Sequence, residues 1–169
     1  KIEVMGIVNL TDDSYFAESR CQNAGKALKR VETMLEQGAD IIDIGAHSTR
    51  PNHTVLTEND ELEIIKNFLP LIYNETKAVI SVDTFYPSVA EYALKNGASI
   101  INDVSGVFNE KMAELVVRYN CGWIIMHTGG GDSITVPEYT TTVTEDVIDF
   151  FSEMVKKCVS YGINKKQLC

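Results

Sequence analysis

The sequence has 169 residues, of which 44% are hydrophobic and 23% charged, and its formal net charge is −9. This composition is that of an ordinary globular domain and excludes a disordered or fibrous chain. The acidic balance argues against nucleic-acid binding, because neutralising the phosphates of a duplex requires a basic face. A small anionic substrate is still compatible, since a metal ion or a few local cations can hold it.

Two further patterns are missing from the sequence. It has no run of about 18 apolar residues, and its N-terminus lacks a basic region followed by an apolar stretch and a cleavage site. We therefore expect a cytoplasmic protein that does not engage a membrane. The cysteines form no Cys-x-x-Cys pair, which speaks against a zinc site or a disulfide framework and favours reduced, mostly buried thiols. They are Cys21, Cys121, Cys158 and Cys169.

Short apolar runs alternate with helical patterns along the whole chain. Each run is continuous rather than alternating, as in parallel strands that are covered on both faces. The predicted strands are residues 2–8, 41–45, 79–82, 99–102 and 123–126. Helical spacing between them predicts five helices, which start near Ala24, after the capping residue Thr57, at Pro87, after Asn109 and at Thr144.

The segments Gly38–Asp43 (GADIID) and Gly97–Asn102 (GASIIN) are near copies, which indicates an internal βα repeat. Repeated βα units form either a doubly wound open sheet or a (β/α)8 barrel, and a barrel typically takes about 250 residues. Five units are too few to close a barrel, so both architectures stay open at this point. A sixth strand is expected to begin near Leu168.

Polar side chains follow the apolar strands where each strand gives way to a loop. In both architectures the carboxyl ends of the strands converge on one pocket. A single Asp in such a place is often a helix cap, but the recurrence on five strands points to a site. Asp and Asn there offer acceptors and donors to a flat heterocycle with amidine-like N–H groups. The residues concerned are Asn9, Asp43, Asp83, Asn102, Asp103 and His127.

Two loops carry groups suited to anions. Asn9 and the segment 11–14 place hard oxygen donors after the first strand, which suits Mg²⁺ sharing its shell with substrate phosphates; the alternative is a solvated turn. Ser48-Thr49-Arg50-Pro51 presents a hydroxyl and a guanidinium after the second strand, a pairing suited to phosphate or carboxylate oxygens.

Five ordered motifs resemble those of the dihydropteroate synthases, a family of pterin-binding enzymes. They are Met5–Ser14, Asp40–Pro51, Ile80–Thr84, Ile101–Gly106 and Ile125–His127. The resemblance implies a (β/α)8 TIM barrel. Residues 1–169 would then form one pterin-binding domain that is the N-terminal portion of the barrel, with about its first five βα units.

The resemblance also implies an activity. The family consists of transferases of folate biosynthesis, which condense 6-hydroxymethyl-7,8-dihydropterin pyrophosphate with p-aminobenzoate and release pyrophosphate. It implies catalytic roles for Asn9, Arg50 and Asp83, and a Mg²⁺ site that includes Asn9 and Asp13. A homodimer is implied for the full-length form.

For substrate binding, the resemblance implies that Thr49 and Arg50 serve the anionic and aminobenzoate side of the pocket. Asp83 and Asn102 would hold the pterin ring, and Met126 would pack on its face. The partners expected are therefore small molecules, without nucleic acid or membrane.

The sequence departs from the family in several places. Residues 11–19 lack the proline, the later Asp and the two glycines of the family's first loop, and His47 stands where Glu is common. The later Asp-Pro-Gly, active-site Lys, Ser-Arg-Lys and Arg-x-His segments have no counterpart, so we expect a chain that ends at Cys169 to be inactive alone. The alternatives are a non-catalytic pterin-binding paralogue, a pterin-dependent methyltransferase and a barrel metallohydrolase. A metallohydrolase would carry a His-x-His pair on the first strand, and this sequence has none there.

Overall fold

The computed structural model describes residues 2–10, 20–46, 56–128 and 142–169. For residues 20–23 it describes the backbone alone. Five parallel strands form one sheet in chain order, and each pairs with its predecessor. They are β1 (Met5–Asn9), β2 (Ile41–Gly45), β3 (Val79–Asp83), β4 (Ala98–Asp103) and β5 (Gly122–Ile125).

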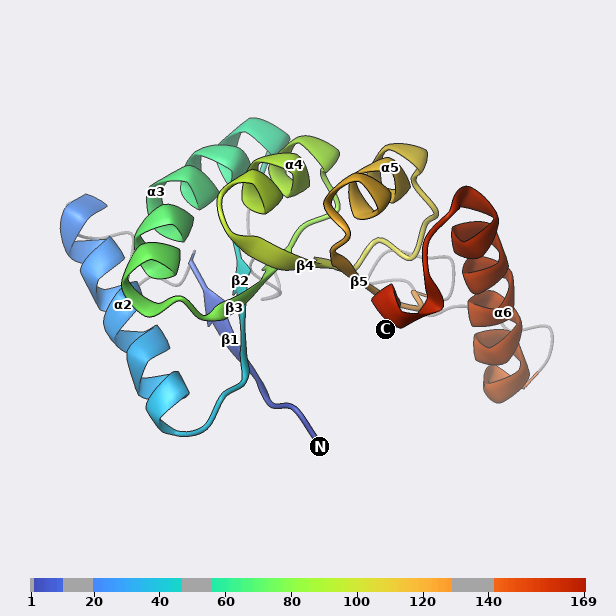
Figure 1. Cartoon of the computed structure of the whole chain (residues 1–169), viewed down its shortest axis with the longest axis horizontal. Coiled ribbons are helices and arrows are strands. Elements are labelled where there is room, and N and C mark those ends of the chain that lie inside the picture. The colour runs from blue at the N-terminus through green and yellow to red at the C-terminus, as the bar shows by residue number, and fades with distance from the viewer. Residues whose placement is uncertain (1, 11–19, 47–55, 129–141) are drawn as a thin grey trace.

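The helices form an arch along one face of this sheet (Figure 1). They are α2 (Arg20–Glu36), α3 (Glu58–Thr76), α4 (Pro87–Lys95), α5 (Glu110–Tyr119) and α6 (Val143–Tyr161), followed by the short 3-10 helix η1 (Lys165–Gln167). In the part of the chain that the structure describes, no helix is long and apolar enough to cross a membrane.

The strand order decides between the two predicted architectures. A doubly wound sheet reverses its strand order and carries helices on both faces, whereas a barrel adds each strand on the same side. The order here runs without reversal and the described helices lie on one face. The predicted barrel is confirmed as a partial α/β barrel. The backbone of Cys169 exchanges hydrogen bonds with Trp123 (3.1 Å) and Ile125 (2.9 Å), where the sixth strand was expected.

The core lies between the sheet and the helices. The strand side chains Ile42, Ile44, Ile80, Val82 and Ile101 are fully buried there. Side chains alternate along a strand, so the neighbouring residues face the opposite, concave side. On that side Ile7 is 69% exposed and Val79 is 45% exposed. The helical side therefore supplies most of the apolar burial in the described chain, and the concave side is available for other uses.

Most of the predicted helix starts are confirmed. Thr57 and Asp60 form the capping box of α3, Pro87 opens α4, and the Asn109 side chain accepts the amides at the start of α5. The prediction for α6 was two residues late: Thr142 caps this helix in a capping box with Glu145. The reason is spacing, because the box requires a hydroxyl residue three positions before the acidic one.

The thiols give a first test of the fold. Burial raises the pKa of Cys121 to about 11 and also raises that of Cys158, whereas Cys169 is exposed. Because the thiolate is the reactive form, iodoacetamide at mildly alkaline pH should modify Cys169 of the 169-residue chain and spare Cys121 and Cys158 until denaturant is added. Peptide mass spectrometry measures this. Alkylation of native Cys121 at the rate of Cys169 would contradict the described packing.

Gly97, which ends the α4 unit, gives a second test. Its φ is +109°, and a Cβ there would lie 2.5 Å from Cγ of Tyr73. Gly97→Ala should therefore lower the free energy of unfolding by about 2–4 kcal/mol, from left-handed strain and overpacking together. The matched control is Gly25→Ala within α2, where a Cβ meets nothing within 4 Å. This variant should gain about 0.5–1 kcal/mol in urea denaturation; equal effects of the two substitutions would contradict the account.

Candidate functional site

Three polar residues and a glycine lie at one level across the carboxyl ends of the first four strands. Asn9 is in register with Gly45, Gly45 with Asp83, and Asp83 with Asn102. Residues in register on neighbouring parallel strands point to the same face and are about 4.8 Å apart. The structure thus brings Asn9, Asp83 and Asn102 into one row on the concave face, as the sequence predicted. We call these four residues the strand-end row.

A buried carboxylate lies beneath the row. Asp43 is only 3% exposed, and its Oδ2 accepts a hydrogen bond of 3.1 Å from the Asn102 side-chain amide. This bond crosses β3 to join β2 to β4. The sequence prediction placed Asp43 where its strand ends, but it is the third residue of a five-residue strand. It therefore supports the row from below.

Gly45 makes room for the Asp83 side chain. A Cβ at Gly45 would lie 3.3 Å from both Cβ and Oδ2 of Asp83. Any larger residue would crowd the carboxylate, so this glycine belongs to the site although the sequence prediction did not include it. The available signal was a glycine at the end of an apolar strand, but its meaning depends on which residue faces it from the next strand.

Backbone contacts fix β3, β4 and β5 relative to one another at this end. The amide of Thr84, a fully buried residue, donates to the carbonyl of Asn102 at 3.0 Å. The amide of Met126 donates to the carbonyl of Asp103 at 3.3 Å. Met126 follows β5 directly, and its side chain is 42% exposed. An exposed thioether at the edge of a polar row offers an adaptable apolar surface for a flat ring.

Two other predicted strand-end residues serve the local structure. The Asp103 carboxylate accepts a hydrogen bond of 2.9 Å from the amide of Ser105. Asp103 directly follows Asn102 in β4, so its side chain points to the helical side of the sheet, where it is 3% exposed. His127 pairs through Nε2 with Asp146 of α6 at 2.8 Å, and its ring meets Phe150 edge to face. These contacts fasten the β4–α5 turn and the start of α6.

The predicted residues of the two anion-binding loops lie outside the described residues. They are Asp13, Thr49 and Arg50. One contact does approach the second loop from the described side: the Tyr86 hydroxyl donates to the carbonyl of Leu56 at 3.5 Å. Burial, with the charges of Glu61 and Glu58, raises the pKa of Tyr86 and keeps this hydroxyl a donor.

Within the described ranges, no group of three His, Cys, Asp or Glu residues is placed to hold a metal ion. Mg²⁺ that is bound together with substrate phosphates needs only one or two protein ligands, because phosphates and water complete its shell. Asn9 supplies an amide oxygen of the required hard type at the edge of the strand-end row. Of the predicted Mg²⁺ ligands, Asn9 is therefore the one in the described residues, and its amide oxygen is of a type that such an ion accepts.

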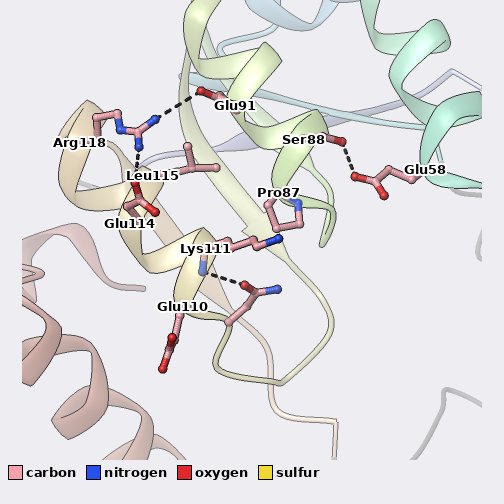
Figure 2. A pocket seen from close by; sticks show the side chains of 10 residues that line it. Glu58, Pro87, Ser88, Glu91, Glu110, Lys111, Glu114, Leu115 and Arg118 are labelled. Atoms are coloured by element: carbon pink, nitrogen blue, oxygen red, sulfur yellow. Dashed lines mark hydrogen bonds and ion pairs between the residues drawn. The ribbon is translucent and has the colours of Figure 1, made fainter.

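A groove of about 750 Å³ opens on the outer helical layer, between α4 and α5 (Figure 2). Several of its polar side chains pair with one another: Arg118 bridges Glu91 and Glu114, and Ser88 donates to Glu58. None of the residues of the strand-end row, nor Met126, lines it. The groove is therefore separate from the predicted site.

The fold and the site together define a parallel βα-barrel protein with a polar site at the strand ends. The family described as "Pterin binding enzyme" matches residues 5–169, and the chain belongs to this family. It is 36% identical over 170 residues to the dihydropteroate synthase of Bacillus subtilis, covering 99% of this chain and 57% of that protein.

Solved structures agree in fold. A dihydropteroate synthase from Clostridium difficile, determined in the presence of pteroic acid, superposes with a TM-score of 0.87 at 34% identity, over 98% of this chain and 62% of that one. The Xanthomonas albilineans enzyme with 4-aminobenzoic acid gives 0.82 at 33% identity, over 98% and 59%. The chain thus spans about three fifths of the length of these relatives.

Gly45→Ala tests the close approach at the strand ends. The added Cβ should displace the Asp83 carboxylate. If Asp83 holds the pterin ring, as the family resemblance implies, pterin binding should weaken about 5–10-fold, the loss of one hydrogen bond in a buried setting. Pterin fluorescence titration of the longest natural chain that contains these residues measures the affinity.

The matched control for this substitution is Gly122→Ala. A Cβ at Gly122 also meets a neighbour at 3.3 Å, but that neighbour is the aliphatic Ile100. Gly122 begins β5 and is in register with Ile100, two residues before Asn102, so it lies below the level of the row and on the strand beyond it. An equal loss of affinity in both variants would show that Gly45 acts through general stability alone.

Proposed function

We propose that the protein containing this chain is a dihydropteroate synthase. It condenses 6-hydroxymethyl-7,8-dihydropterin pyrophosphate with p-aminobenzoate to give 7,8-dihydropteroate and pyrophosphate. The observation that carries the proposal is the in-register row that places Asn9, Asp83 and Asn102 on one face. Membership of the pterin-binding family and relatives determined with pteroic acid and 4-aminobenzoic acid support it.

The two ends of the strand-end row would bind different parts of the substrate. Asp83 and Asn102 are on adjacent strands and would hold the N–H edge of the pterin ring, with Met126 against its face. Asn9 is two strands from Asp83, roughly 10 Å away along the sheet, and would face the pyrophosphate end of the substrate. This polarity matches a substrate with a ring at one end and an anion at the other.

The reaction proposed is a substitution in which pyrophosphate leaves the pterin methylene carbon and the aniline nitrogen of p-aminobenzoate attacks it. Asp83 would stabilise the positive charge that spreads into the ring as the leaving group departs. Thr49 and Arg50 would bind the anionic and aminobenzoate groups through a hydroxyl and a guanidinium. Mg²⁺ held by Asn9 and Asp13 would supply neutralisation of the leaving pyrophosphate. We further propose that the protein is cytoplasmic and forms a homodimer in its full-length form.

The test is pyrophosphate release from the dihydropterin pyrophosphate by the longest natural chain that contains this sequence. Release should require both p-aminobenzoate and Mg²⁺, and Asp83→Asn should lower kcat/KM about 100-fold or more, as for the loss of a charged contact in the transition state. Pterin binding without release would contradict the synthase and favour a non-catalytic paralogue, an interpretation supported by the altered residues 11–19.

A further inference from the structure

We propose that Asp43 is a positioning residue for the pterin ring: it holds the Asn102 amide with its oxygen turned toward the ligand. This inference rests on the proposed function and assigns a role to a residue that does not itself contact the substrate. It starts from the hydrogen bond between Asn102 Nδ2 and Asp43 Oδ2, at 3.1 Å.

The bond determines the orientation of the amide. A side-chain amide has one end that donates and one that accepts, and the two ends are nearly equal in shape. Because a carboxylate oxygen accepts, the end of Asn102 that faces Asp43 is the NH₂ group. The Oδ1 of Asn102 then points away from Asp43, toward the open end of the strands.

This orientation makes the neighbouring side chains of Asp83 and Asn102 a pair of acceptors. The carboxylate of Asp83 and the Oδ1 of Asn102 lie on adjacent strands in one register. Two neighbouring acceptors are complementary to the neighbouring N–H groups of an aminopyrimidine edge. A reversed Asn102 would turn its own N–H groups toward those of the ring and leave both sides without partners, at the cost of desolvation.

The surroundings of Asp43 indicate that its carboxylate does not stabilise the fold. Its side chain is 3% exposed, in a strand whose other residues are Ile41, Ile42, Ile44 and Gly45. Within the described part of the chain its Oδ1 has no hydrogen-bond partner. A buried carboxylate with one satisfied oxygen costs stability compared with an uncharged residue of the same shape. A role in orienting Asn102 accounts for its place in the sheet.

The experiment uses the longest natural chain that contains these residues, with the single substitution Asp43→Asn and an exchange variant that combines Asp43→Asn with Asn102→Asp. An amide at position 43 can offer either end to Asn102, so the single variant should bind 6-hydroxymethylpterin about 10-fold more weakly. The KM of this variant for the dihydropterin pyrophosphate should rise as well. Its KM for p-aminobenzoate should stay unchanged, and its melting temperature should not fall.

In the exchange variant the new amide at position 43 donates to the new carboxylate at position 102, whose second oxygen faces the ligand. Affinity should therefore return to within about three-fold of the wild type.

Asp103→Asn is the matched control, because Asp103 is equally buried but on the opposite face; it should leave the pterin affinity unchanged. Wild-type affinity in Asp43→Asn, with affinity lost in Asp83→Asn, would refute the positioning role and keep the pterin site. A folded exchange variant that stays weak would refute it too, and this variant decides the matter if the single variant does not fold. Wild-type protein that binds no pterin would contradict the proposed function itself.

Discussion

The register of four parallel strands is the constraint on which the site depends. Asn9 lies 74 positions before Asp83, and Asp83 lies 19 positions before Asn102. Only backbone pairing, which passes through Gly45, brings the three to one level. A slip of one residue in any strand would turn its polar side chain to the helical face. The helices secure this register indirectly, because they cover one face of the sheet and bury the isoleucines and valines that point to that face.

The two faces of the sheet thus differ in function: the helical face forms the core, and the concave face carries the polar side chains. On the helical face, strand side chains such as Ile44 and Val82 are fully buried in the main core. On the concave face, the polar groups Asp43, Ser81 and Asn102 replace apolar volume, at a cost in desolvation that the helical face offsets. This division explains how a sheet with nearly continuous apolar strands can carry a row of hydrogen-bonding side chains on one face.

Local signals made much of the fold predictable. The β2 strand was predicted with its observed bounds, and Thr57 and Asn109 mark helix starts because capping depends on neighbouring residues alone. The strand-end row was also predictable in outline, since parallel strands bring their carboxyl ends together. The roles of Gly45 and Asp43 were not predictable, because each depends on the residue opposite it in another strand, and register is not written in local sequence. The ligand proposed for the row came from the resemblance of the family motifs, since spacing alone left the ligand open.

The most direct test of the account is where a pterin binds. Titration of the nitrogen-15-labelled, longest natural chain with 6-hydroxymethylpterin, followed by amide chemical shifts, locates the ligand without relying on turnover. The account predicts the largest shift changes at Gly45, Asp83, Asn102 and Met126. Changes centred on Glu91 and Arg118 in the outer groove, with the strand ends unaffected, would contradict it.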